Sequence, residues 1–200
     1  MLLLLNMDKS SIETFLAHMN NGITNASFTD AHGNAFPYDK ALGEIAALFK
    51  HTADTEKKLI FVGNGGSAAI ASHMAQDYTK IGGIRAVCFN DPSLMSCFGN
   101  DYSFEDMFAK AIEFYADQGD TVIAISSSGS SKNIINAAKT AKVNGCAVVT
   151  LSGFDKKNPL FALGTLNIHI PTQTYGTTET AHGLFLHAIL DHLADNLPHN

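Results

Sequence analysis

Tryptophan is absent from the 200-residue chain, and cysteines and basic residues are few. The three cysteines, Cys88, Cys97 and Cys146, are widely spaced and form no Cys-x-x-Cys pair, which argues against a disulfide framework. We expect them to be buried, reduced thiols of a cytoplasmic protein. The 13 lysines and arginines are scattered and are outnumbered by 19 aspartates and glutamates. This acidic balance excludes the basic stripe of a nucleic-acid-binding protein.

Long apolar runs are missing as well. No segment approaches the roughly 18 apolar residues that span a bilayer, so the sequence predicts no membrane helix. The apolar opening, residues 1–7, is too short for a signal peptide and lacks a charged start and a small-residue cleavage site. Met7 is an alternative start, and whether residues 1–6 belong to the native protein stays open.

The length and the 46% hydrophobic content fit one globular domain over residues 1–200. Apolar residues at helical spacing predict helices over 8–22 and 38–52, separated by a polar loop at Thr29–Asn34. We therefore expect an N-terminal helical pair in residues 1–55, ahead of a core in residues 56–197.

From residue 59 onward, short apolar runs alternate with longer amphipathic segments. Each run is typical of a strand buried on both faces of a parallel sheet. The runs are Leu59–Val62, Arg85–Phe89, Thr121–Ile125, Ala147–Leu151 and Leu166–Ile170, and the helices between and after them are expected at 66–80, 103–117, 131–144 and 177–195. The alternation predicts a doubly wound, flavodoxin-like α/β fold with a five-stranded parallel sheet and helices on both faces.

Two loops follow predicted strands and precede predicted helices. The first is Gly63-Asn64-Gly65-Gly66-Ser67, and the second runs over Ser126–Ser131 with Gly129 among five serines. Ligands of open α/β sheets bind at the carboxyl ends of strands, where glycine amides, serine hydroxyls and helix N-termini can hold an anion. The predicted phosphate-binding residues are Asn64, Gly65, Gly66, Ser67, Ser126, Ser127, Ser128 and Ser131.

Two other interpretations of these loops exist. Each could be a tight strand-to-helix turn with N-cap serines. Two such loops at equivalent positions in the topology favour a binding site over two unrelated turns. Gly63, Gly65 and Ala68 also match the G-x-G-x-x-A dinucleotide fingerprint. The acidic residue expected about 20 positions later is late here, at Asp91, and a nucleotide leaves the serine loop without a role. We therefore predict no nucleotide cofactor.

The two loops and their flanks resemble the sugar isomerase (SIS) family, and most closely its phosphoheptose isomerase branch. The matching segments are Gly63–Ser67 with Ala71–Ala75, Asn90-Asp91, Gly99–Asp101, Ser126–Asn133, Leu151–Gly153 and the last helix with Glu179, His182 and His187. The resemblance spans about residues 40–195. It implies an aldose–ketose isomerase acting through an enediol, with sedoheptulose 7-phosphate as the expected substrate and a heptose phosphate for surface polysaccharide as the product.

Acid–base and metal candidates lie on two predicted helices. His73 and Asp77 are four residues apart, and Glu179 and His187 are eight apart, about 80° around a helix, so each pair shares a face. The resemblance implies that Asp77 is the base, that His187 is the partner acid, and that His73, Asp77, Glu179 and His187 can hold zinc. It also implies that Asp101 and Glu179 contact the substrate, and that the chain forms a homotetramer with sites near the interfaces.

The sequence departs from the family pattern at three places near the expected site. Asp77 and Glu179 stand where the family usually has Glu and Gln, and Gly176-Thr177 replaces an Asp-Arg pair. These differences leave the exact sugar open. The alternative is a non-catalytic SIS protein, either a phosphosugar sensor or an adaptor like the DnaA initiator-associating protein, which should keep the phosphate loop and lose the acid–base pair. His169 and His182 are expected to be structural or packing residues.

Overall fold

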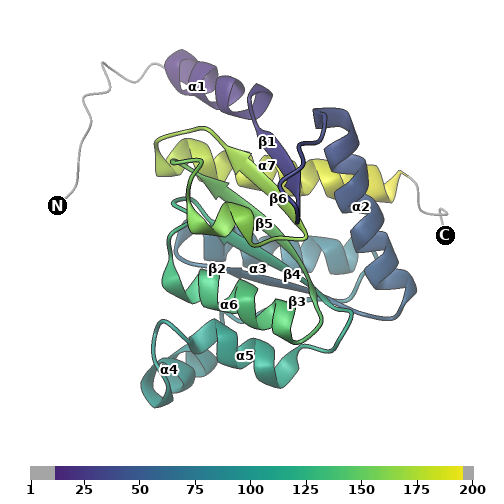
Figure 1. Cartoon of the computed structure of the whole chain (residues 1–200), viewed down its shortest axis with the longest axis vertical. Helices are drawn as coiled ribbons and strands as arrows, with labels where there is room; N and C mark the ends of the chain where they lie inside the picture. The colour runs from purple at the N-terminus through teal and green to yellow at the C-terminus, as the bar shows by residue number, and fades with distance from the viewer. Residues whose placement is uncertain (1–11, 196–200) are drawn as a thin grey trace.

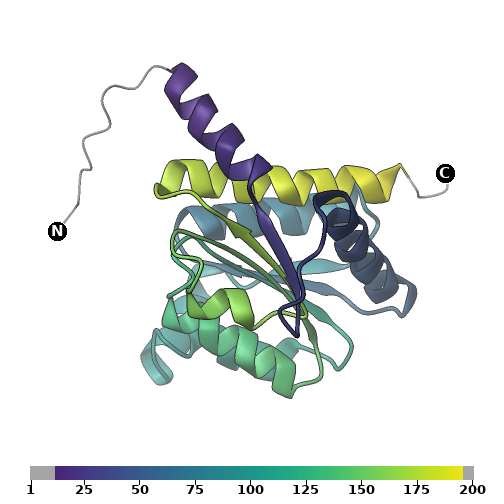
Figure 2. The ribbon, with the colours of Figure 1, turned by 45° about the horizontal axis from the view of Figure 1, so that its top comes forward.

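The computed structural model describes residues 12–195, so residues 1–6 and the start of the helix expected at 8–22 lie outside the described residues. Helix α1 spans Ile12–Thr24 and α2 spans Tyr38–Asp54. Both predicted N-terminal helices are therefore present. They do not form a pair, because each packs against the last helix, α7 (Tyr175–Ala194), at a different place (Figure 1; Figure 2).

The central sheet has six strands in the order β1-β6-β5-β4-β2-β3, not the five that the sequence predicts. The five expected strands are present and parallel: β2 (Leu59–Gly63), β3 (Ala86–Cys88), β4 (Thr121–Ser126), β5 (Ala147–Gly153) and β6 (Leu166–Ile170). The sixth, β1 (Ser27–Asp30), runs antiparallel to β6 at the edge.

Strand β1 overlaps the segment predicted as a polar loop. Phe28 is buried and faces Ile168 of β6, while the Asp30 carboxylate accepts hydrogen bonds from the backbone N–H groups of His32 and Asn34. A four-residue strand with one buried apolar side chain carries too little periodicity to be predicted. The N-terminal segment thus contributes to the sheet and is more than a helical addition to it.

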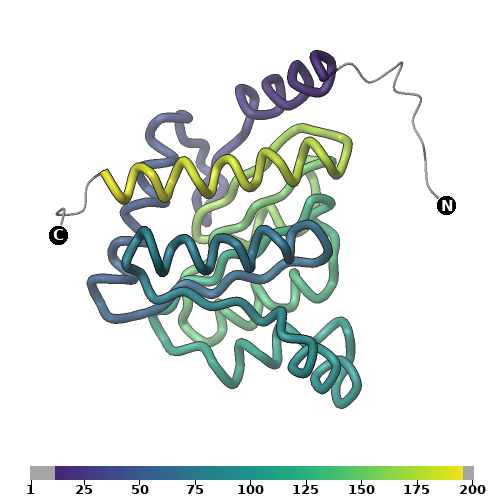
Figure 3. The backbone as a smooth tube through the Cα atoms, turned by 180° about the vertical axis from the view of Figure 1, so that it is seen from behind, coloured from purple at the N-terminus to yellow at the C-terminus, as the bar shows by residue number. Residues whose placement is uncertain are grey.

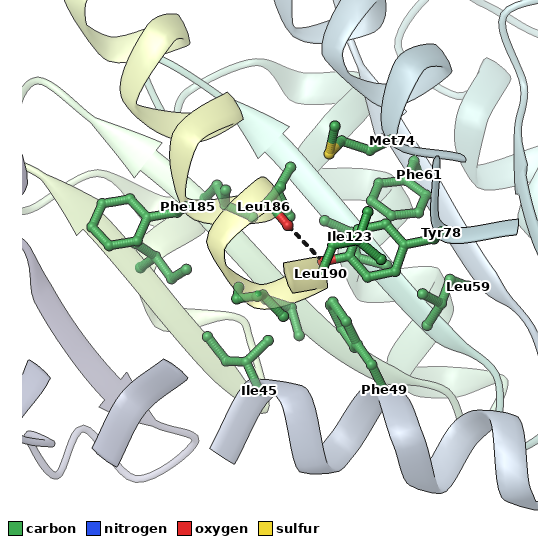
Figure 4. Packing of buried hydrophobic residues seen from close by; sticks show 14 of the residues in the cluster. Ile45, Phe49, Leu59, Phe61, Met74, Tyr78, Ile123, Phe185, Leu186 and Leu190 are labelled. Carbon is green, nitrogen blue, oxygen red and sulfur yellow. Dashed lines mark hydrogen bonds between the residues drawn. The ribbon is translucent and has the colours of Figure 1, made fainter. Parts of the chain in front are cut away.

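Two helical layers cover the sheet. Helices α2, α3 (Gly66–Lys80) and α7 cover one face, where α3 and α7 lie side by side (Figure 3). In this larger core the Tyr78 hydroxyl donates to the Leu186 carbonyl at 2.9 Å (Figure 4). Helices α5 (Met107–Tyr115) and α6 (Lys132–Val143) cover the other face. Each strand of the centre is therefore buried on both sides, as the apolar runs predict.

Three details differ from the sequence predictions. The helix expected at 103–117 is only α5, and a separate helix, α4 (Pro92–Asp101), precedes it, begun by Asp91, whose carboxylate accepts from two backbone N–H groups. Strand β3 lies at an edge, so Val87 is exposed instead of buried. Cys97 is exposed on α4, which buries none of its residues, whereas Cys146 is buried and Cys88 is half-buried. Between residues 12 and 195, no helix combines the length and apolar character needed to cross a bilayer.

Candidate active site

The two glycine- and serine-rich loops lie next to each other because their strands are neighbours. Gly63 at the end of β2 is in register with Ile125 near the end of β4. Asn64 and Asn133 exchange two amide hydrogen bonds of 2.9 Å, one in each direction, and so join the first loop to α6. This reciprocal pair fixes the spacing of the loops without any charged group.

A pocket of about 270 Å³ opens between the loops and the first turns of α7. It contains every residue predicted to bind substrate except Asp101, and two that were not predicted, Ile125 and Tyr175. Its lining residues are Asn64, Gly65, Gly66, Ser67, Ile125, Ser126, Ser127, Ser128, Ser131, Tyr175 and Glu179. No lysine or arginine is among them.

Backbone N–H groups at the starts of α3 and α6 are the main hydrogen-bond donors expected in this pocket. Gly65 and Ser131 are the N-cap residues of α3 and α6, and neither makes a side-chain cap hydrogen bond. Within residues 12–195, the backbone N–H groups of the first two residues of each helix make no hydrogen bond, so they can bind an anion. Gly65 adopts a φ of 53°, a left-handed conformation that glycine adopts easily.

Ser127 provides the clearest sign of an absent partner. Its side chain is 4% exposed, and its hydroxyl oxygen has no hydrogen-bond partner among the described residues. A buried hydroxyl without a partner is costly, so it indicates a partner that the chain itself does not supply, such as a bound ligand. The neighbouring Ser126 hydroxyl donates to Ser131 at 3.2 Å, so Ser127 is the hydroxyl that remains to be satisfied.

Polar contacts with the end of β5 and the segment after it support the serine loop. The Gly153 N–H donates to the Ser127 carbonyl at 2.9 Å, and the Leu160 N–H donates to the Gly129 carbonyl at 3.1 Å. Gly129, at a φ of 63°, approaches the Asn158 side chain so closely that a Cβ atom would overlap it. The serine loop is thus shaped by residues that do not line the pocket.

Glu179 faces the start of α3. Its carboxylate lies against Gly66, where a Cβ atom would overlap both carboxylate oxygens. Burial raises the pKa of the Glu179 carboxyl. A carboxylate is favoured electrostatically at a helix N-terminus, but here it shares that terminus with the predicted phosphate site.

The acid–base candidates form a separate cluster between α3 and α7. The ligand atoms of His73, Asp77 and His187 all lie within 4.8 Å of one another. His73 Nε2 is 3.3 Å and His187 Nδ1 is 4.0 Å from the same Asp77 oxygen. The centroids of the two imidazole rings are 5.3 Å apart. Two imidazoles and a carboxylate so placed suit zinc, which prefers four nitrogen, sulfur or oxygen ligands in a tetrahedron. Glu179, expected as the fourth ligand, is not in this group.

The chain by itself does not bring every predicted site residue into one pocket. His73 and Asp77 line a larger groove of about 810 Å³ along α3 and β3. Asp101 lies at the end of α4, where its carboxylate accepts from the Asn100 amide and the Cys97 thiol. Asp101 therefore does not line the pocket between the two loops, and its contact with the substrate stays a prediction.

Sequence reasoning missed Tyr175 and the supporting residues of the serine loop. Tyr175 stands four residues before Glu179, a spacing that would have placed it on the same helical face had the helix been predicted to start there. Asn158 follows β5 in a loop without any motif, and its amide donates to Ser152, Gly153 and Asp155. Nothing local in the sequence signals that role.

Comparisons with known proteins agree with this architecture. Residues 38–153 match the SIS domain family. The phosphoheptose isomerase of Fusobacterium nucleatum is 36% identical over 76% of this chain and 80% of its own length. That of Aliarcobacter butzleri is 33% identical over 96% and 100%.

A solved structure gives the same relationship. The phosphoheptose isomerase GmhA from Neisseria gonorrhoeae superposes with a TM-score of 0.79 and 27% identity, covering 92% of this chain and 97% of that one. The family match covers more than half of the chain, and the curated relatives exceed 30% identity over most of it. The chain therefore belongs to the SIS domain family, among the phosphoheptose isomerases.

Proposed function

We propose that this protein is an aldose–ketose isomerase that converts sedoheptulose 7-phosphate into D-glycero-D-manno-heptose 7-phosphate through an enediol. The observation that carries the phosphate part is the buried, unpartnered Ser127 hydroxyl, in a pocket with two uncapped helix N-termini and no lysine or arginine. Such a site favours an anion through amides and hydroxyls. The curated relatives named phosphoheptose isomerase support the choice of sugar.

Isomerisation moves one proton between C1 and C2 of the sugar, with no net oxidation. Asp77 takes the proton from C1, and the C1–H electrons form the C1=C2 bond of the enediol. His187 donates a proton to the C2 carbonyl oxygen and takes one from the C1 hydroxyl as the new carbonyl forms. Asp77 then returns its proton to C2. The 4.0 Å between His187 Nδ1 and the Asp77 oxygen places acid and base side by side.

Alternatively, His73, Asp77 and His187 would hold zinc, in which case Asp77 and His187 would bind the ion in place of exchanging protons with the sugar. A bound zinc ion would polarise the carbonyl and stabilise negative charge on the enediolate. Glu179 could complete four ligands only if its side chain moved away from Gly66. In the described arrangement Glu179 therefore lines the proposed phosphate pocket, and His73, Asp77 and His187 are left as the candidate zinc ligands.

The phosphate site is tested by calorimetric titration of inorganic phosphate and sedoheptulose 7-phosphate into the protein and its Ser127→Ala variant. Loss of the buried hydroxyl should weaken binding of both about ten- to a hundredfold, because one hydrogen bond to a charged group contributes about 1.5–3 kcal/mol. Ser130→Ala is the matched control, since Ser130 is in the same loop and does not line the pocket. Equal affinities in the two variants would contradict the assignment of Ser127.

The chemistry is tested by an isomerase assay of Asp77→Asn and His187→Ala, with and without zinc. Each should lose at least about a hundredfold in kcat, the usual contribution of a positioned acid or base. His51→Ala, an exposed histidine on α2, should keep full activity. Phosphosugar binding without turnover in the unaltered protein would instead identify a sensor or adaptor.

We also propose a homotetramer, because one chain leaves apolar side chains uncovered. Phe104, Phe114 and Tyr115 are more than half exposed, at 61%, 64% and 54%, and β3 is an open sheet edge. Exposed apolar surface of this kind usually marks an association surface. Light scattering should give four times the chain mass, and Phe104→Ser with Phe114→Ser should lower it. A monomer in the unaltered protein would refute this proposal.

The cytoplasm is the compartment that we propose. All three thiols, Cys88, Cys97 and Cys146, are free, as is usual for proteins kept in reducing surroundings.

A further inference from the structure

Phe154 has an unusual backbone conformation at the rim of the pocket. It directly follows β5 and has a φ of 56°, in the left-handed region that bulky residues rarely adopt. The Phe154 N–H donates to the Thr172 carbonyl at 3.0 Å, and its own carbonyl accepts from the Gln173 amide at 3.3 Å. Glycine would adopt this conformation freely, so the presence of phenylalanine here points to a role for the ring.

The Phe154 ring packs edge-on against Tyr175 in the first turn of α7. The ring centroids are 5.1 Å apart, with an interplanar angle of 73°. Tyr175 lines the pocket one helical turn before Glu179, yet its side chain is 62% exposed. No hydrogen bond of the Tyr175 hydroxyl occurs within residues 12–195. The Tyr175 ring is thus in contact with Phe154, while more than half of the residue stays exposed.

We propose that Tyr175 is a specificity residue that contacts the carbon chain of the substrate, and that Phe154 positions it. This inference rests on the proposed function, because it assumes that the phosphate is bound by the two loops. Residues of both loops and Tyr175 line the same pocket. The carbon chain of a phosphate ester bound at the loops begins in this same pocket, so C–H groups next to the phosphate can pack on the Tyr175 ring.

The proposal makes the pocket selective for phosphate esters that carry an extended polyol chain. Inorganic phosphate has no carbon chain that could pack on the Tyr175 ring. The binding of the free anion and of the sugar ester should therefore respond differently to changes at Tyr175. That difference separates this inference from the phosphate site itself.

The test compares Tyr175→Ala and Tyr175→Phe by calorimetry with two probes, inorganic phosphate and sedoheptulose 7-phosphate. Tyr175→Ala should weaken sugar-phosphate binding about tenfold and leave phosphate binding within twofold, since one aromatic contact is lost. Tyr175→Phe keeps the ring and should bind both probes like the unaltered protein. Circular dichroism checks the fold, which an exposed side chain should not affect.

Phe154→Gly tests the positioning role with a variant that suits the backbone. Glycine relieves the left-handed conformation, so the melting temperature should stay equal or rise. Without its support, Tyr175 should be less ordered, and KM for the sugar phosphate should rise about threefold to fivefold with kcat within twofold. A purely structural role for Phe154 would lower the melting temperature and leave KM unchanged.

The outcomes separate the two proposals. If the unaltered protein binds neither probe, the proposed phosphate site fails and this inference fails with it. If the unaltered protein binds both probes and Tyr175→Ala binds the sugar phosphate equally well, this inference alone is overturned. An unchanged KM in Phe154→Gly would remove Phe154 from the proposal and leave Tyr175 in place.

Discussion

At the scale of single residues, Glu179 is the group whose chemistry most affects the pocket. Its carboxylate lies against Gly66 at the start of α3, and it has no basic neighbour in the pocket. The helix N-terminus favours a negative charge, but a carboxylate and a phosphate dianion so close together repel each other. Glu179 should therefore weaken the phosphate affinity that the loops would otherwise provide.

Replacement of Glu179 by Gln removes this repulsion and keeps the shape of the side chain. We expect Glu179→Gln to bind inorganic phosphate about five- to tenfold more tightly, with the gain shrinking at high salt. Titration calorimetry at two ionic strengths measures the change. Glu44→Gln on α2, which does not line the pocket, is the control. Weaker phosphate binding in Glu179→Gln would show that the carboxylate supports the site, for instance by holding a cation.

At the scale of elements, the serine loop depends on the segment that follows β5. Gly153, Asn158 and Leu160 each contact the loop or its neighbours through the backbone or an amide. Gly129 is the closest point of this contact, because its missing side chain makes room for Asn158. The shape of the pocket is thus set jointly by two successive strand-to-helix connections.

A methyl group at Gly129 should separate these two connections. Gly129→Ala adds a Cβ where Asn158 lies and forces a left-handed conformation on alanine, so we expect a loss of about 1–3 kcal/mol in the free energy of unfolding. Phosphate binding should fall below detection as the loop moves. Denaturant unfolding and calorimetry measure the two effects.

The control for this variant is Gly43→Ala on α2. Gly43 has open space where a Cβ would be placed, so alanine should stabilise the helix by about 0.5–1 kcal/mol and leave phosphate binding unchanged. If Gly129→Ala behaved like Gly43→Ala, the close approach to Asn158 would not shape the site.

At the scale of the whole molecule, two buried histidines link stability to pH. His169 is 1% exposed and His182 is fully buried, and burial lowers the pKa of each to about 4. Both meet Ser152: His182 Nε2 lies 3.2 Å from its carbonyl oxygen, and His169 Nδ1 lies 3.4 Å from its hydroxyl. Their packing therefore requires neutral rings, as expected for the structural role that the sequence predicts.

The sign of the pH effect follows from these pKa values. The unfolded chain binds protons at these histidines below about pH 6.5, whereas the folded chain does so only near pH 4, so stability is full above pH 6.5 and falls as the pH decreases. Between pH 6.5 and about pH 4, each histidine should lower the free energy of unfolding by about 1.4 kcal/mol for every pH unit of acidification. Urea unfolding at pH 7, 6 and 5 measures the slope, and His169→Asn should reduce it by about half. A stability that does not change between pH 7 and pH 5 would contradict the assignment.

Much of the α/β core could be predicted because its signals are local. The apolar runs at Leu59–Val62 and Thr121–Ile125 correspond to β2 and β4, and the helix expected at 66–80 has the bounds of α3. Each strand buried on both faces must be apolar along its length, so the pattern survives without knowledge of its neighbours. Edge strands lack that constraint, which is why β1 was missed and the exposure of β3 was wrong.

The pocket between the two loops, where we propose that phosphate binds, could be predicted from the same local patterns. Loops after parallel strands open at one edge of the sheet, so Ser67 and Ser127 could be placed near each other from their positions after two strands. Their actual proximity required β2 and β4 to be neighbours, which pairing over more than 60 residues decides. The prediction therefore depended on topology that the α/β pattern implies only in general terms.

What the sequence determined by itself was the chemistry available: an uncharged anion site at two helix N-termini and a histidine–carboxylate set on two helices. Only the tertiary structure decided how those groups are divided, with Glu179 at Gly66, Asp101 away from the pocket, and Tyr175 at its open side. The physical reason is that residue types and helical spacing fix which groups share a face. Which face meets which loop is set by the packing of α3, α7 and the sheet, through contacts between residues far apart in the chain.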